Sequence, residues 1–142
     1  MKRTVWMLTL TLVVGIAIGI MGTHVLNAQS TQQQEPVKRK VLLQTDLADI
    51  AGKEATLGLA EYAPGASSGK HYHPRHVLIY VLEGSAINEP EGKPPVTLKQ
   101  GDVLYEPPKL VHNFKNASTT APFKLLGCGI GEKGQPRVVP VE

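Results

Sequence analysis

Short runs of hydrophobic residues, separated by turn-forming residues, extend along the chain from residue 38 to the end. The runs are rich in Val, Leu, Ile and Tyr, which favour pleated strands, and Gly, Pro, Asn and Asp gather between them. No segment after residue 38 shows the apolar spacing of a long helix. The pattern predicts an all-β domain, a sandwich or barrel, with turns that include residues 88–92. The expected strands are residues 41–44, 55–63, 70–73, 77–82, 96–99, 103–105, 111–114 and 123–130.

The run at residues 77–82, VLIYVL, is apolar at every position. Because side chains alternate between the two faces of a strand, both faces of this strand are apolar, as in strands that are covered on both sides. One face would fill the interior of the barrel, and the other needs a second sheet or a second subunit. A domain of roughly 105 residues buries a limited core, so we expect a homodimer.

The amino-terminal residues resemble a targeting segment rather than part of the domain. Lys2 and Arg3 precede an apolar run over residues 5–21, and Ala28 provides a small residue for cleavage before Gln29. This order predicts an export signal and a periplasmic or secreted protein. The run also approaches the length that spans a bilayer, so an uncleaved anchor in the inner membrane is the alternative, and the only membrane contact that we expect.

The expected organisation is therefore a signal peptide or anchor at residues 1–28, a polar tether at residues 29–37, and one domain at residues 38–142. The tether, QSTQQQEPV, has too little apolar surface to fold alone.

Cys128 is the only cysteine, which excludes an intramolecular disulfide, and its apolar neighbours predict a small buried side chain.

Charge does not indicate a nucleic-acid-binding protein. The 15 basic and 12 acidic residues give a formal net charge of +3, and Lys2 and Arg3 of the leading segment account for most of this excess. The basic residues are scattered and aromatic residues are few, so stacking platforms for bases are not expected. The cluster at residues 38–40, Lys-Arg-Lys, is interpreted as a solvated strand edge.

Histidines provide the strongest indication of chemistry. His71 and His73 are one residue apart, so on a strand both imidazoles point to the same side, where they could hold one metal ion. A mononuclear site needs at least a third protein ligand, and His112 is the candidate.

The two histidine-containing stretches resemble the two sequence motifs of the cupin superfamily. The matching residues of the first motif are Gly65, His71, His73 and Gly84, and those of the second are Gly101, Pro107, His112 and Asn116. The resemblance implies a double-stranded β-helix, the jelly-roll barrel of cupins. It also implies a metal held by His71, His73 and His112, and pairing of subunits, which is common among cupins.

Two residues depart from the motifs. Lys109 stands where the second motif has a glycine, which bears on the turn. Val77 stands where the family has a metal-binding glutamate, so one carboxylate of the usual three-histidine, one-glutamate set is missing. Three-histidine centres without the glutamate occur among cupins, thiol dioxygenases being an example.

Two residues could replace the missing ligand. His76 faces away from His71 and His73 on a regular strand, unless a bulge at residues 74–75 re-aims it. Glu106 precedes two prolines, and the turn before His112 leaves its face undetermined; a fourth ligand, a general base and an exposed rim residue are all consistent with its position. Tyr80 and Tyr105 are candidates for positioning a substrate through a hydroxyl, although such aromatics more often fill a barrel.

The expected function is that of an exported cupin with a divalent transition metal (Fe, Zn, Cu, Ni or Mn) and a small-molecule substrate. A redox metal would imply an oxygen-dependent, dioxygenase-like oxidoreductase, and a non-redox metal an isomerase or hydrolase. Two alternatives stay open, a barrel that binds or senses a small ligand without turnover and a metal-free structural cupin.

Overall fold

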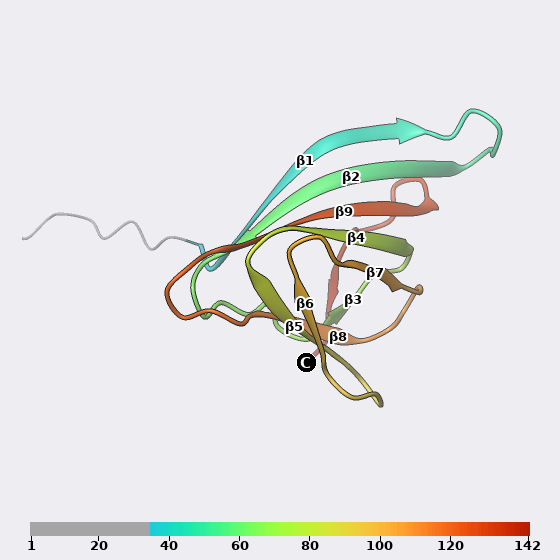
Figure 1. The fold of residues 1–142 in the computed structure, drawn as a ribbon. Coiled ribbons are helices and arrows are strands. Elements are labelled where there is room, and N and C mark those ends of the chain that lie inside the picture. The colour runs from blue at the N-terminus through green and yellow to red at the C-terminus, as the bar shows by residue number, and fades with distance from the viewer. Residues whose placement is uncertain (1–34) are drawn as a thin grey trace, which may run out of the picture. The chain divides into compact units, whose positions relative to one another are not determined.

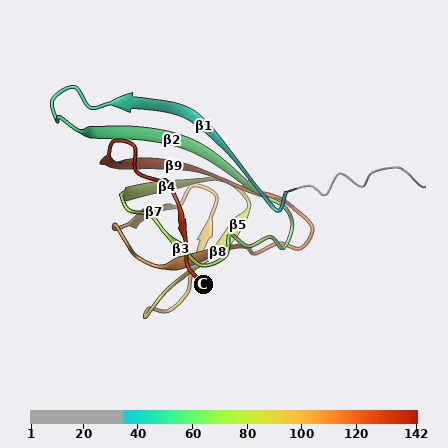
Figure 2. The ribbon, with the colours of Figure 1, turned by 180° about the vertical axis from the view of Figure 1, so that it is seen from behind.

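The computed structural model describes residues 35–142, and the strands form two five-stranded antiparallel sheets that face each other (Figures 1 and 2). The first sheet has the order β1-β2-β9-β4-β7 and the second has the order β10-β3-β8-β5-β6. The strands of the first sheet are β1 (Val37–Asp46), β2 (Lys53–Tyr62), β4 (His76–Glu83), β7 (Val103–Glu106) and β9 (Phe123–Glu132). Those of the second are β3 (His71–Tyr72), β5 (Ser85–Pro90), β6 (Val96–Lys99), β8 (His112–Asn116) and β10 (Val139–Pro140).

The chain passes repeatedly from one sheet to the other, which is the connectivity of a jelly roll, so the predicted fold is confirmed. Between residues 35 and 142, no helix is long and apolar enough to cross a membrane. The predicted targeting segment and most of the tether lie outside the described residues. The first strand begins at Val37, one residue before the predicted start of the domain.

The core lies between the inner faces of the two sheets. Tyr62, Phe114 and Phe123 pack with ring centroids 5.5 to 6.4 Å apart, within the range of favourable aromatic contacts. Val81 and Ala86 are fully buried next to them. These residues fill one end of the space between the sheets, and the other end holds the three motif histidines described below.

Motif residues outside the histidines have structural roles. Gly84 has a φ of 78°, and a Cβ atom there would lie 2.7 Å from the carbonyl oxygen of Pro122, so the turn from β4 to β5 requires glycine. The buried amide of Asn116 donates to the carbonyl oxygens of Tyr62, Ala63 and Ala121. Asn116 therefore ties the end of β8 to two other segments.

Lys109, which stands where the second motif has a glycine, has a strained backbone conformation. Lys109 has a φ of 64°, in the left-handed region that side chains with a Cβ atom rarely adopt. Its backbone N–H donates to the carbonyl oxygen of His73 at 2.7 Å, which holds the turn after β7 against the strand that carries the first two histidines.

Two predictions about strands are corrected. Residues 88–90 belong to β5 and do not begin a turn, and β10 was not expected. In β5 the inward side chains are Ala86, Asn88 and Pro90, which lack the apolar alternation by which a strand is recognised. The strand exists because it pairs with both β6 and β8, which sequence periodicity does not reveal.

The outer face of β4 is exposed in the single chain. Val77, Ile79 and Val81 are buried, whereas Leu78 and Tyr80 keep 52% and 45% of their surface exposed. The second sheet thus covers only one face of this strand, and of the two covers expected for the other face, a second sheet or a second subunit, the first is absent from residues 35–142.

Candidate metal centre

The three motif histidines converge between the sheets. His71 in β3 pairs directly with His112 in β8, and His73 follows β3 by one residue. One nitrogen from each ring can be chosen so that all three lie within 4.8 Å of one another. This arrangement could hold one metal ion, as the sequence predicts.

Each imidazole has its Nδ1 atom next to an oxygen acceptor. The acceptors are the carbonyl oxygen of Gly69 for His71 at 2.9 Å, that of Arg137 for His73 at 2.5 Å, and Oδ1 of Asn88 for His112 at 3.1 Å. An Nδ1–H that donates to such an oxygen leaves Nε2 with its lone pair. Acceptors of this kind orient metal-binding histidines and fix their tautomer.

Burial keeps the rings of His71 and His73 neutral. It lowers the pKa of His71 to about 4, although the hydrogen bond to Gly69 opposes the shift and the neighbouring His112 and His73 add to it. Burial also lowers the pKa of His73, against the hydrogen bond to Arg137 and the charge of Glu106. Neutral imidazoles are the form that binds metals, so the site is ready for a cation at neutral pH.

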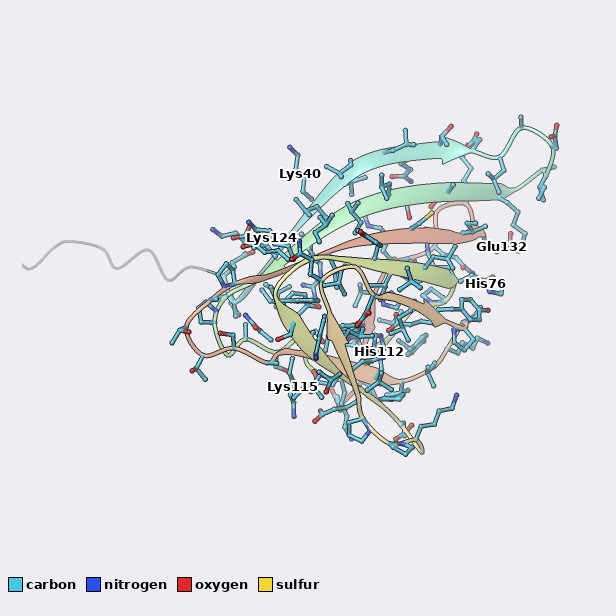
Figure 3. The ribbon with its side chains drawn as sticks, in the orientation of Figure 1. Lys40, His76, His112, Lys115, Lys124 and Glu132 are labelled. Carbon is cyan, nitrogen blue, oxygen red and sulfur yellow. The ribbon has the colours of Figure 1, made fainter. Side chains whose placement is uncertain are left out.

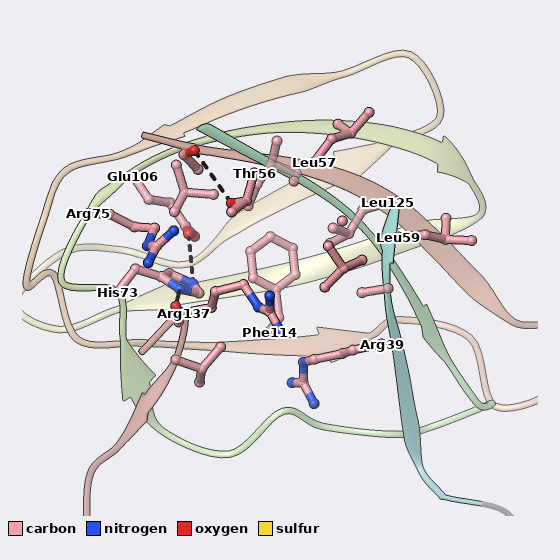
Figure 4. A pocket seen from close by; sticks show the side chains of 18 of the residues that line it. Arg39, Thr56, Leu57, Leu59, His73, Arg75, Glu106, Phe114, Leu125 and Arg137 are labelled. Carbon is pink, nitrogen blue, oxygen red and sulfur yellow. Dashed lines mark hydrogen bonds and ion pairs between the residues drawn. The ribbon is translucent and has the colours of Figure 1, made fainter. Parts of the chain in front are cut away.

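Glu106 supplies a carboxylate from the neighbouring strand. In the pairing of β4 with β7, it lies directly opposite Val77, the position of the missing glutamate. Cross-strand neighbours have Cβ atoms about 5 Å apart on the same face, so Glu106 reaches the space that a glutamate at residue 77 would occupy. Its Oε2 atom is 3.5 Å from Nε2 of His73 (Figure 4).

Buried polar atoms without partners fit a cation at this point. Nδ1 of His112 has two oxygen neighbours, Oε1 of Glu106 at 2.9 Å and its hydrogen-bond partner Oδ1 of Asn88 at 3.1 Å. Both Glu106 oxygens and Nε2 of His112 are buried and have no hydrogen-bond partner among the described residues. Buried polar atoms without hydrogen bonds are costly, and a divalent metal held by the three histidines would satisfy Nε2 of His112, with the Glu106 carboxylate nearby.

The other candidates lie on the outer face of the first sheet. His76 is exposed at the start of β4, where its Nδ1 atom is 2.7 Å from the hydroxyl of Tyr105, and it lies away from His112 (Figure 3). Tyr105 and Tyr80 are about half exposed on the same face. The structure therefore brings Glu106 to the three histidines and does not bring His76, Tyr80 or Tyr105 there.

A cavity of about 190 Å³ adjoins the three histidines and Glu106. Its walls are mostly apolar, with Val77, Ile79, Phe114 and Leu125 among the lining residues. On β2 and β9, small residues leave the space open, since Gly58, Ala60 and Gly127 contribute little side-chain volume.

An ion pair borders this cavity. Arg75, 2% exposed, donates from Nη1 to Oε1 of Glu54 at 3.2 Å and from Nη2 to the carbonyl oxygen of Gln135 at 2.6 Å. Cβ atoms at Gly129 and Gly131 would lie 2.9 and 2.6 Å from its side chain, so these glycines make room for it.

Sequence reasoning missed three residues of this region. Asn88 lay within an expected turn, and Arg75 within an expected bulge. Arg39 was assigned to a solvated strand edge, yet it lines the cavity. The sequence carries no local pattern for these roles, because each depends on pairing between distant strands.

Comparison with known proteins agrees with the fold. The family model for the Cupin domain matches residues 58–127. A search of curated proteins found no sequence that matches this chain.

Solved structures share the architecture at low sequence identity. A cupin-like protein from Thermotoga maritima is 28% identical, with a TM-score of 0.53 over 74% of this chain and 75% of its own. The polyketide cyclase RemF from Streptomyces resistomycificus is 23% identical, with a TM-score of 0.59 over 76% of this chain and 72% of its own. The DMSP lyase DddQ from Ruegeria pomeroyi is 19% identical, with a TM-score of 0.62 over 80% of this chain.

The chain spans about half the length of the DMSP lyases that it matches, 44% and 56% of the two chains. The family model, the jelly roll and the positions of the motif residues together identify this chain as a member of the cupin superfamily.

Proposed function

We propose that this protein is a metal-dependent cupin that acts on a small organic molecule in the cavity beside His71, His73 and His112. One observation carries the proposal: three imidazoles, each with Nδ1 at an oxygen acceptor, face a buried carboxylate whose oxygens accept no hydrogen bond from the described residues. In this proposal Glu106 is the fourth ligand and replaces the glutamate that the family has at the position of Val77.

A nitrogen and carboxylate set of this kind suits Fe, Mn, Ni, Cu or Zn. Such a metal would supply Lewis-acid polarisation of a bound group and, if it is redox-active, reactivity toward dioxygen. The chain itself orients the imidazoles through Gly69, Asn88 and Arg137. Its apolar walls exclude water from the substrate.

The reaction that we favour is an oxygen-dependent oxidation of the dioxygenase type. Similarity to a polyketide cyclase and to DMSP lyases supports a small organic substrate, and it makes cyclisation or elimination the alternative reactions. Oxygen uptake separates these classes, because only the first consumes dioxygen.

The first experiment is elemental analysis of the protein from Gln29 onward, purified without chelators or a histidine tag. We expect one transition metal per chain, lost in the His112→Ala variant and retained in His76→Ala. Chains that bind no metal after reconstitution would contradict the proposal and leave a metal-free barrel.

A ligand-binding barrel without turnover is the second candidate function. The mostly apolar lining favours it, since Glu106 is the one carboxylate among the lining residues and is already a proposed ligand. A metal-loaded protein that is stabilised by a small ligand but neither consumes oxygen nor converts that ligand would support it.

We further propose that the outer face of the first sheet is covered by a second copy of the chain. Exposed apolar side chains from two adjacent strands form a continuous patch there, comprising Leu78, Tyr80, Val103 and Tyr105. Ion pairs between Lys53 and Glu132 and between Lys124 and Glu83 lie on the other strands of the same sheet, β2 and β9, and at the end of β4. An apolar centre with a polar rim is typical of subunit interfaces.

Light scattering tests this interface. We expect a dimer for the natural protein and a monomer for Tyr80→Lys, with metal content unchanged. A monomeric natural protein at all concentrations would contradict the proposal.

Export is proposed from the amino-terminal sequence alone. The supporting features are Lys2 and Arg3, the apolar run at residues 5–21, and Ala28. Sequencing of the mature amino terminus should begin at Gln29, whereas a protein that stays in the membrane fraction with Met1 or Lys2 at its start would indicate an anchor.

A further inference from the structure

Two arginines at the mouth of the cavity have no acidic partner among the described residues. Arg39 and Arg137 both line the cavity and both have exposed side chains. No ion pair formed within residues 35–142 includes either of them. By contrast, several surface lysines do have carboxylate partners: Lys53, Lys115, Lys124 and Lys133.

The register of β1 places Arg39 on the inner face of the sheet. Val37 pairs with Tyr62 and is buried, and Arg39, two residues later, pairs with Ala60 on the same face. Ala60 is small, so the arginine side chain can extend over the strand toward the cavity. Lys38, one residue earlier, pairs with Glu61 and points to the opposite face.

Arg137 is tied to the candidate metal centre through its backbone. Its carbonyl oxygen is 2.5 Å from Nδ1 of His73, so the residue lies beside the first-motif histidines. Figure 4 shows Arg137 and Arg39 in the same part of the view, with the ring of Phe114 drawn above them.

The cavity therefore has an excess of positive charge. Glu54 neutralises Arg75 by a buried ion pair, and Glu106 is the one carboxylate among the lining residues. A divalent cation held by Glu106 and the histidines would increase the excess. Positive charge at the mouth of a mostly apolar cavity attracts an anion and raises its local concentration.

We propose that the small molecule taken by this cavity is an organic acid with an apolar body, whose carboxylate binds Arg39 and Arg137. The planar guanidinium matches a carboxylate, with which it forms paired, charge-assisted hydrogen bonds. The apolar body lies against Ile79, Phe114 and Leu125, and the carbon chain extends toward His73 and Glu106. This inference deepens the proposed function, because it rests on the same cavity accepting a small molecule.

Hexanoate, hexan-1-ol and hexylammonium are suitable probes, because they share an apolar chain and differ in charge. Calorimetric titration of the metal-loaded protein is expected to show hexanoate binding about tenfold more tightly than hexan-1-ol, and no binding of hexylammonium. In the double variant Arg39→Gln, Arg137→Gln, the preference for hexanoate should fall to about twofold or less.

Lys38→Gln is the matched control, because it removes the same charge from the same strand on the opposite face. It should keep the preference for hexanoate. Failure of hexanoate to bind at millimolar concentration, equal affinity for hexanoate and hexan-1-ol, or an unchanged preference in the double variant would each overturn the inference.

Repeating the titration after removal of metal separates this inference from the proposed function. A preference for hexanoate that persists without metal, and is lost in the double variant, supports recognition by the arginines. A preference that disappears with the metal and is unaffected by the arginine substitutions would assign the carboxylate to the metal and overturn the inference, while metal content stays as proposed.

Discussion

The two faces of the first sheet reverse the usual distribution of polarity, in which apolar side chains are buried and charged ones are exposed. The inner face buries the charged residues Glu54, Arg75 and Glu106, whereas the outer face exposes Leu78 and Val103. Charged side chains are seldom buried unless they are paired or bind a metal, and large apolar patches are seldom left in water. The inner face is thus suited to chemistry and the outer face to a partner, and each prediction below tests this difference.

The largest effect is expected from removing a histidine of the inner face. His112→Ala should weaken metal binding more than about a hundredfold, because it removes a direct ligand. Loss of a group that only hydrogen-bonds to a ligand already costs about tenfold or more in metal affinity. His76→Ala, on the outer face, should leave the affinity unchanged. Competition with a chelating dye measures the metal affinity of both variants. Equal losses of affinity in the two variants would contradict the difference between the faces.

Acid should destabilise the metal-free protein through the inner face. Since burial lowers the pKa of His71 from 6.5 to about 4, the unfolded chain binds more protons between these values. The contribution of His71 to the free energy of unfolding is therefore constant above pH 6.5 and decreases by about 3 kcal/mol on acidification to pH 4. Urea unfolding at several pH values measures how the free energy of unfolding changes with pH. This change should become smaller in His71→Gln, and an equal change in that variant would assign the effect to other groups.

Exchanging residues 77 and 106 tests whether the carboxylate can act from either strand. Glu106→Val should weaken metal binding by about tenfold to a hundredfold, because it leaves three imidazoles alone. Adding Val77→Glu to that variant should restore most of the affinity, since the two positions are cross-strand neighbours on the inner face. A double variant as weak as Glu106→Val would show that Glu106 does not replace the family glutamate.

The turn that follows Glu106 gives a smaller effect. Because Lys109 has a φ of 64°, Lys109→Gly should stabilise the protein by about 1 kcal/mol, with unchanged metal content. Lys109→Ala is the control, since it removes the charge but keeps the Cβ atom, and it should give no gain. Denaturant unfolding compares the three proteins, and a gain in the alanine variant would attribute the effect to charge.

The smallest effect is expected on the outer face. Tyr105→Phe removes the hydroxyl that contacts His76, but both residues are exposed in the single chain. The free energy of unfolding should change by less than about 0.5 kcal/mol, and metal affinity should not change. A loss of metal in this variant would place Tyr105 in the site and contradict the contrast between the faces.

The sequence alone was sufficient for an all-β sandwich or barrel, and its resemblance to the cupin motifs was sufficient for the jelly roll and the three histidines. Strand-forming runs and turn residues are local, and the spacing of His71 and His73 places both on one face by the period of a strand. His112 could be assigned with them because the second motif is also a local pattern. The turn strain at Lys109 was likewise indicated by the residue that replaces glycine.

Only the tertiary structure decided which other residues join the histidines. Glu106 lies opposite Val77, Asn88 lies at His112, and Arg39 faces the cavity, because strands far apart in sequence pair in particular registers. A shift of one residue in such a register would turn each side chain to the other face. Register is set by the packing of the whole barrel, so a single strand's sequence does not contain it.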